Sequence, residues 1–280
     1  MNVCLLPEVL SRINNLSDAS RRASAIGARV VIDQFHYENM TSAHQETNEK
    51  SVSKTKAPGY NPAFIQGIVT HFPKLDFICL QETWSRALTR PLIKELHKVF
   101  PWILHSVGAT SYNSNRFLLN SGLMFASRYR ILDADFRWFK HSCNQCVYSS
   151  KGLLMVKVLV SEKDKTYVGY IYNTHLQAYQ GVNNVLEKQL DCMLQWTREF
   201  REQTLDLGDV ILFDVVCGDF NFDNMSPGEA GLRDHALFSE YEDVGRVRPG
   251  LDQKWTVGKI VYHSSTTLYY FHQRKIWYLS

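Results

Sequence analysis

Three apolar stretches of the chain each run directly into a cluster of polar side chains. They cover residues 75–80, 167–172 and 210–217, and they end in Gln81-Glu82, Asn173-Thr174-His175 and Gly218-Asp219-Phe220-Asn221. Short continuous apolar runs predict buried strands. Because ligands bind beyond the carboxyl ends of strands in open α/β sheets, we expect Glu82, His175 and Asp219 to meet at one rim.

Helical periodicity is clearest between residues 184 and 203. Apolar side chains recur there at intervals of three and four, which predicts a long amphipathic helix whose stripe packs on the sheet as core. The stripe consists of Leu186, Leu190, Met193, Leu194, Thr197 and Phe200. Residues 8–28 also read as helical, with a break at Ser17-Asp18, and residues 62–72 and 91–100 read as short helices opened by proline.

Residues 34–61 have a different composition, rich in Thr, Ser, Asn, Glu and Lys and nearly free of aliphatic side chains. Such a segment cannot offset its ordering entropy by burial, so we expect a disordered insertion. With 280 residues, 45% of them hydrophobic, and no visible repeat, the chain otherwise predicts a single large α/β domain. No stretch approaches the roughly 20 apolar residues that span a bilayer, and no secretory signal opens the chain.

The carboxylates beyond two of the apolar stretches are candidates for a magnesium site. Mg²⁺ prefers hard oxygen ligands and is commonly held by one or two carboxylates plus a substrate phosphate. Glu82 is therefore the expected ligand, aided by Asp219. Asn221 stands two residues beyond Asp219, so in an extended continuation both side chains share one face and can position a water. His175 can donate to a phosphate oxygen as charge builds in a transition state.

Each of these residues also has a plain structural interpretation. A Gln-Glu pair after a strand often only begins a polar loop, and a histidine at a strand end often only satisfies an edge hydrogen bond. Asn120 can anchor a turn through its side chain. Lys151 precedes a long apolar run, so it can be a solvated cation at the start of a strand.

The motifs, taken in order, resemble the magnesium-dependent endonuclease/exonuclease/phosphatase superfamily. Within it the chain is similar to the neutral sphingomyelinases, the membrane-associated sphingomyelin phosphodiesterases of the type 3 and type 5 group. The words that carry the resemblance are Asn2-Val3-Cys4-Leu5-Leu6-Pro7, Gln81-Glu82, Asn120-Ser121-Gly122-Leu123, Ser150-Lys151-Gly152, Asn173-Thr174-His175 and Gly218-Asp219-Phe220-Asn221. They identify residues 1–258 as a catalytic domain and leave residues 259–280 as a divergent tail.

The resemblance implies a DNase I-like four-layer α/β sandwich that hydrolyses sphingomyelin to ceramide and phosphocholine. It implies Mg²⁺ as the cofactor, with Mn²⁺ as an alternative ion, and a membrane surface as partner. The implied site consists of the metal ligand Glu82, the catalytic residues His175, Asp219, Asn221 and Asn2, and the substrate-binding residues Asn120 and Lys151. Asn2, His175 and Asn221 would contact phosphate. In the family the lysine is paired with an aspartate five residues earlier, where this chain has Cys146.

The chain departs from the family at both ends. It begins on the first-strand asparagine, without the family's upstream membrane segments, which predicts a cytoplasmic or peripheral membrane protein. Sequences of the family continue to an Arg-Ile-Asp-Tyr motif and a closing Asp-His motif that carries the general base. Residues 259–280 of this chain contain neither motif. We therefore expect a sheet that is incomplete at its C-terminal strands and impaired hydrolysis. Arg233-Asp234-His235 is interpreted as an ordinary helical segment, not as a substitute base.

The cysteines change the predicted function little. Cys143 and Cys146 have the spacing of a metal or redox pair, but no second pair exists to complete a zinc site. Without a disulfide framework, the six cysteines suit a reducing compartment.

The net charge is +3, and six of the 31 Lys and Arg residues lie from Arg246 onward against the single acid Asp252. Such a tail suits either a membrane surface or an unfolded terminus, and we favour the terminus. No ordered basic stripe precedes it, so we expect no nucleic-acid partner. A nuclease or phosphoinositide phosphatase of the same superfamily, and a non-catalytic fragment that binds lipid or a partner, are the alternatives.

Overall fold

Two β-sheets form the centre of the computed structural model, which describes residues 1–5, 16, 18–46, 74–110, 116–178 and 183–253. The first has the order β1-β3-β2, from Phe77–Leu80, Met124–Ser127 and Trp102–Leu104, and both of its pairings are antiparallel. The second has the order β4-β5-β6-β7, from Arg130–Trp138, Gly152–Glu162, Thr166–His175 and Asp209–Asp219. Its pairings are antiparallel except between β6 and β7, which run parallel.

Alternation of side chains along the strands divides the interior into three cores. On β1, Cys79 faces the second sheet while Ile78 and Leu80 face the opposite way, toward helices. On β5, Leu154 lies between the sheets and Leu153 lies on the outer side. The two sheets therefore pack face to face, with each outer face left for a helical layer.

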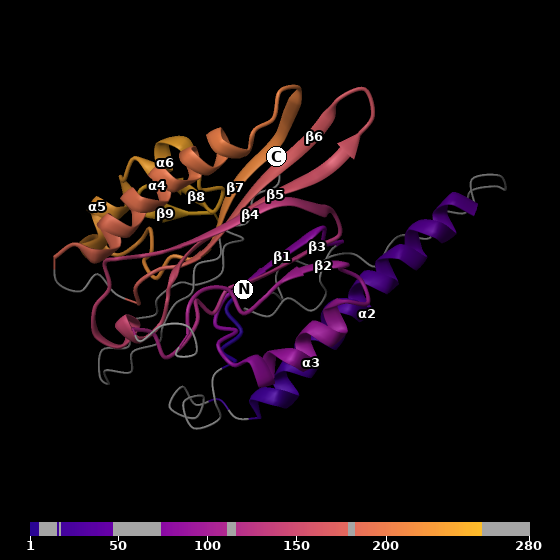
Figure 1. The fold of residues 1–280 in the computed structure, drawn as a ribbon, viewed down its shortest axis with the longest axis horizontal. Coiled ribbons are helices and arrows are strands. Elements are labelled where there is room, and N and C mark those ends of the chain that lie inside the picture. The colour runs from indigo at the N-terminus through magenta and orange to yellow at the C-terminus, as the bar shows by residue number, and fades with distance from the viewer. Residues whose placement is uncertain (6–15, 17, 47–73, 111–115, 179–182, 254–280) are drawn as a thin grey trace.

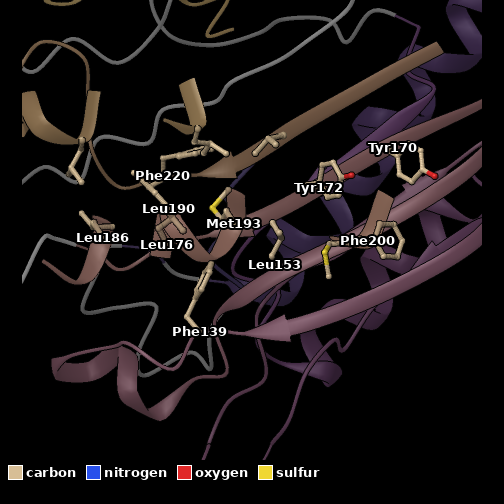
Figure 2. Packing of buried hydrophobic residues seen from close by; sticks show 14 of the residues in the cluster. Phe139, Leu153, Tyr170, Tyr172, Leu176, Leu186, Leu190, Met193, Phe200 and Phe220 are labelled. Carbon is tan, nitrogen blue, oxygen red and sulfur yellow. The ribbon is translucent and has the colours of Figure 1, made fainter. Parts of the chain in front are cut away.

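Helix α4 (Val185–Thr204) covers the outer face of the second sheet, as the sequence predicts to within one residue at each end. Its buried positions include Leu186, Leu190, Met193, Thr197 and Phe200, and Leu194 is partly buried. Figure 2 shows Met193 and Phe200 of this helix beside Leu153, Tyr170 and Tyr172 from the strands beneath. The apolar stripe is core, which confirms the prediction.

Helices α2 (Ala19–Glu46) and α3 (Arg86–Leu96) cover the outer face of the first sheet (Figure 1). The layers thus run helices, three-stranded sheet, four-stranded sheet, helix, and this arrangement confirms the predicted four-layer α/β sandwich. Shorter elements complete the described part: the 3₁₀ turns Asn144–Tyr148 and Pro227–Glu229, the helices α5 (Ala230–Arg233) and α6 (Leu237–Glu240), and the strands β8 (Arg246–Arg248) and β9 (Leu251–Asp252).

The predicted disorder of residues 34–61 is wrong for its first part, because α2 continues to Glu46. Gln34 is fully buried, and its side-chain Oε1 accepts a hydrogen bond from Leu75 N at 2.7 Å. A polar residue thus anchors the helix to the sheet where sequence pattern alone suggested a solvated loop. Residues 47–61 lie outside the described part of the chain, as do the predicted helix 62–72 and residues 8–15.

The helix expected to open at Pro91 begins five residues earlier, so this boundary is also wrong. Ser85 is the N-cap: its side chain accepts from Leu88 N at 3.5 Å, and Thr89 N donates to Ser85 O at 2.9 Å. Pro91 therefore lies inside α3, where it removes one backbone donor without ending the helix. The burial of Leu92 and Leu96 in the core beside α2 holds the helix together beyond it.

The strands that carry the three polar clusters are divided between the two sheets. The clusters were expected at one rim, and β1 belongs to the first sheet while β6 and β7 belong to the second. The clusters meet because the two sheets pack face to face. Among the described residues, no helix combines the length and the apolar character needed to cross a membrane.

Candidate functional site

Asn2 joins the polar ends of the two sheets. Its side-chain Nδ2 donates to Glu82 Oε1 at 2.7 Å and to Asp219 Oδ2 at 3.0 Å. An amide nitrogen carries two protons, so both are used on carboxylates. Its Oδ1 accepts from Cys4 N at 3.1 Å, which fixes the orientation of the amide. Glu82 and Asp219, 137 positions apart in the sequence, are therefore held against one nitrogen.

The backbone explains how Asn2 reaches this position. Residues 1–5 run alongside the end of β1, where Asn2 forms a parallel bridge with Gln81 and Leu5 N donates to Glu82 O at 2.8 Å. Glu82 itself has a left-handed backbone with φ of 62°. This conformation is uncommon for a residue with a Cβ and clusters at functional sites. It turns the chain out of the strand at the metal-ligand candidate.

The ends of β6 and β7 bring the other predicted residues together. His175 is the register partner of Asp219 in the parallel pair. The carbonyl of Leu176 then accepts from Lys151 Nζ at 2.7 Å and from Asn221 Nδ2 at 3.0 Å. Lys151 is thus a buried cation held on backbone, not the solvated one that its position at a strand start can suggest.

Asn221 differs from the extended geometry expected for it. Its φ is 55°, and its backbone N donates to Asp219 Oδ1 at 3.2 Å. Gly218 precedes this turn with φ of 151°, and a Cβ on it would lie 2.2 Å from Thr174 O. Only glycine fits that approach, so the strand pair closes tightly just before Asp219. The turn after the strand, and not strand alternation, brings Asn221 beside Asp219.

Burial dominates the electrostatics of the site. Asp219 is 2% exposed, and this burial raises the pKa of its carboxyl, while the hydrogen bond from Asn2 and the charge of Lys151 partly offset the rise. Burial also lowers the pKa of His175 well below its usual value, and the charge of Lys151 lowers it further. His175 is therefore a neutral imidazole beside a carboxylate that lacks full compensation for its charge.

Asn120 lies in the turn just before β3, whose first residue pairs with Leu80 at the end of β1. It is buried, and its Oδ1 accepts from Gly122 N at 2.8 Å, so it anchors a turn. The polar residues between the sheets add a second link: Gln81 Nε2 donates to Asn173 Oδ1 at 2.7 Å, and Asn173 Nδ2 donates to Leu80 O and Met124 O. These bonds tie the two sheets together directly beneath the carboxylates.

Trp84 is the site residue that sequence reasoning missed. Its side chain is almost fully buried, and its ring lies against His175 with centroids 5.9 Å apart. The signal available in the sequence was its place two residues after Glu82, in a segment that also had to turn toward α3.

His235 hydrogen-bonds to the helical layer that covers the second sheet. Its Nε2 contacts Asp191 on α4 at 3.1 Å, and its Nδ1 accepts from Leu237 N at 3.0 Å. Both ring nitrogens are engaged on the surface of the helical layer. Cys143 and Cys146 flank and enter a 3₁₀ turn, and all six cysteines of the chain are free thiols.

The residues present suit a magnesium ion better than a transition metal. Among the described residues, no group of three or more His, Cys, Asp and Glu side chains is arranged to hold a metal. Glu82 and Asp219 instead offer a pair of carboxylates on a shared hydrogen-bond donor. Mg²⁺ keeps several waters and needs only one or two carboxylates plus substrate oxygens. A cation there would also compensate the buried charge of Asp219.

Comparisons with known proteins find matches over most of the chain. A profile of the Endonuclease/Exonuclease/phosphatase family matches residues 55–266. Sphingomyelin phosphodiesterase 3 of Homo sapiens is 38% identical over 209 residues, which cover 71% of this chain and 32% of that protein. Sphingomyelin phosphodiesterase 5 of Danio rerio is 30% identical over 331 residues, which cover 96% of this chain and 59% of that protein.

The chain thus spans about a third of the first relative and little more than half of the second. Among solved structures, beta toxin from Staphylococcus aureus, in a variant with bound magnesium ions, superposes with a TM-score of 0.53 and 15% identity. The match covers 84% of this chain and 67% of that one. At this level of identity the likeness supports the fold.

Proposed function

Because the chain belongs to the Endonuclease/Exonuclease/phosphatase family, we propose that it is a magnesium-dependent phosphodiesterase that hydrolyses sphingomyelin to ceramide and phosphocholine. The observation that carries the proposal is the convergence of Glu82 and Asp219 on Asn2, beside His175. Such a site has the carboxylates, amide and imidazole that phosphodiester hydrolysis uses. The relatives named sphingomyelin phosphodiesterase favour this substrate over others of the family.

Glu82 would hold the magnesium ion, and Asp219 would lie beside the ion. When bound, the ion would supply charge neutralisation at the phosphate and a lower pKa for bound water. Asp219 would accept a hydrogen bond from the attacking water and so orient it toward phosphorus. His175, neutral and at the end of β6, would donate to a non-bridging oxygen as negative charge develops.

Asn2 and Asn221 would have different roles. Asn2 donates both amide protons to carboxylates. In this geometry it would therefore fix Glu82 and Asp219 and would not contact phosphate directly. Asn221 donates one amide proton to Leu176 O, and its second amide proton would be available for a phosphate oxygen. Lys151 would act through its charge, since its ammonium group already donates to a backbone carbonyl. Asn120 would position the turn at Gly122 and not bind substrate.

We expect turnover by the 280-residue polypeptide to be low. The Asp-His pair that follows Asp219 in this sequence is Asp234-His235, and His235 is engaged on α4. General-base help typically contributes about 10²- to 10⁴-fold, so hydrolysis that relies on an oriented water alone is slow.

The test is phosphocholine release from mixed micelles that contain sphingomyelin, with magnesium or with a chelator. We expect slow, magnesium-dependent release that falls by about 10²-fold or more in Asp219→Asn. Asp164→Asn, in the hairpin between β5 and β6, is the matched control and should leave the rate unchanged. Equal rates for the wild type and Asp219→Asn would contradict the proposed site.

The same preparation should be offered DNA and a phosphoinositide under the same conditions. Cleavage of either at a higher rate than sphingomyelin would replace the proposed substrate with the corresponding alternative. No turnover of any substrate, with magnesium binding retained, would instead favour a non-catalytic role for the chain.

A further inference from the structure

Within the described residues, the buried ring of His175 has a nitrogen without a hydrogen-bond partner. Its Nδ1 is buried and has no partner, and no hydrogen bond to either ring nitrogen occurs within the described part of the chain. A functional imidazole is usually oriented by a carboxylate or a carbonyl on its second nitrogen. Here something else must fix the ring, because the residue is only 4% exposed yet makes no directional bond.

The indole of Trp84 is the aromatic group in contact with that ring. The centroids lie 5.9 Å apart with an interplanar angle of 46°, within the range of favourable aromatic pairs. Trp84 is 9% exposed and His175 is 4% exposed, so both of the packed rings are shielded from water.

Gly122 packs against the same indole. A Cβ on Gly122 would lie 2.9 Å from Trp84 Cε3 and 3.0 Å from Cδ2, so the indole rests directly on the glycine backbone. Gly122 has φ of 71°, which suits glycine, and its N donates to Asn120 Oδ1 at 2.8 Å. Its carbonyl accepts from Thr83 N at 2.9 Å, next to Trp84 in the chain. The glycine and the tryptophan are thus anchored to each other as well as packed.

We propose that Trp84 is a positioning residue that, supported by Gly122, locks His175 in the orientation and tautomer that present an Nε2 proton to the phosphate. This inference rests on the proposed phosphodiesterase function and names the residue that prepares the imidazole for it. Trp84 does not touch the substrate in this account.

The tautomer follows from which nitrogen is buried. A neutral imidazole carries a proton on one nitrogen and a lone pair on the other. If Nδ1 carried the proton, a buried donor would stay unpaired and Nε2 would present a lone pair that repels a phosphate oxygen. With the proton on Nε2, the donor faces the substrate side. Rotation of the ring about Cβ–Cγ would exchange Nδ1 with Cδ2 and Nε2 with Cε1 and so move the Nε2 proton away from the phosphate, and the indole packing opposes that rotation.

The test is long-range ¹H–¹⁵N NMR of the histidine rings in the ¹⁵N-labelled full chain, with the His175 signal assigned by its loss in His175→Gln. We expect one tautomer, protonated on Nε2, in the wild type and in Trp84→Phe. Trp84→Ala should give mixed tautomers or a mobile ring. Trp84→Leu keeps most of the buried apolar volume, so it replaces Trp84→Ala if the alanine variant does not fold. We expect the same mixed tautomers or mobile ring in this variant. Trp102→Ala, at a tryptophan 40% exposed on β2, is the control and should leave the signal unchanged.

Kinetics give a second readout. In the phosphocholine assay, Trp84→Ala should lower kcat by about 10- to 100-fold with KM altered less than about threefold, and Trp84→Phe should restore most of kcat. A single Nε2-protonated tautomer together with unchanged kcat in Trp84→Ala or Trp84→Leu would overturn the inference. If the wild type releases no phosphocholine, the proposed function fails, whereas the NMR result still decides the role of Trp84.

Discussion

A single amide side chain organises the candidate site. Asn2 holds two carboxylates from different sheets, one of them 2% exposed, at a point where like charges would otherwise repel each other. A buried acceptor that loses its donor costs about 1–3 kcal/mol, and more when it is charged. Asn2 therefore stabilises the metal-free fold as well as placing the carboxylates.

Asn2→Leu should destabilise the metal-free protein by about 1–3 kcal/mol because it removes the donor that Glu82 and Asp219 share. The measurement is urea unfolding in the presence of a chelator. In an Asp219→Asn background the same change should cost less, since one of the two charges is gone. Equal costs in the two backgrounds would show that Asn2 and Asp219 are not coupled.

His175 gives the stability a dependence on pH with a definite sign. Burial, and then the charge of Lys151, lower the pKa of His175 below its unfolded value near 6.5. The unfolded chain therefore binds the proton more readily, so the stability contributed by neutral His175 is present above pH 6.5 and is lost as the pH falls toward the folded pKa.

We expect the free energy of unfolding of the wild type to fall more between pH 7.5 and pH 5.5 than that of His175→Gln, measured by urea unfolding without metal. The other histidines and carboxylates are common to both proteins, so the difference isolates residue 175. An equally steep fall in the variant would assign the acid sensitivity to another group.

At the scale of elements, a buried ion pair joins three parts of the second sheet's layer. Lys157 on β5, 1% exposed, contacts Asp209 Oδ2 at the start of β7 at 2.7 Å and Asp206 Oδ2, after α4, at 2.9 Å. The Asp209 side chain is 5% exposed, whereas that of Asp206 is 82% exposed. The two acids are thus a matched pair that differs mainly in burial.

Lys157→Met should destabilise the protein by about 3–5 kcal/mol, because it leaves the Asp209 carboxylate buried and unpaired. Adding Asp209→Leu should recover much of that loss in thermal or urea unfolding. Asp206→Ala should cost less than about 1 kcal/mol, because exposed pairs contribute little. A larger effect from Asp206→Ala than from Lys157→Met would contradict this assignment.

Elements with strong local periodicity were predictable, and elements decided by a few tertiary contacts were not. The stripe of α4 and the apolar runs of β1, β5, β6 and β7 specify their structure locally. Pro91 suggested a helix start because the capping signal at Ser85 was overlooked. Residues 34–46 read as a loop because the anchoring of Gln34 to Leu75 depends on partners 41 positions apart.

At the scale of the whole molecule, four layers put the candidate site where the two sheets meet. The sequence predicts the four layers through its resemblance to a family, and it predicts which residues gather there. It does not predict that Glu82 comes from one sheet and Asp219 from the other, because strand pairing is non-local. Nor does it predict Trp84 and the Leu176 carbonyl, whose roles depend on turn geometry after the strands.

We propose that Glu82 and Asp219 form a magnesium site on the donor that Asn2 provides. Isothermal titration calorimetry of the chelator-treated 280-residue chain with Mg²⁺ tests it most directly. We expect a binding isotherm for the wild type, none for Glu82→Ala, and an unchanged one for the control Glu162→Ala, whose side chain lies exposed at the end of β5. An isotherm for Glu82→Ala that matches the wild type would contradict the claim.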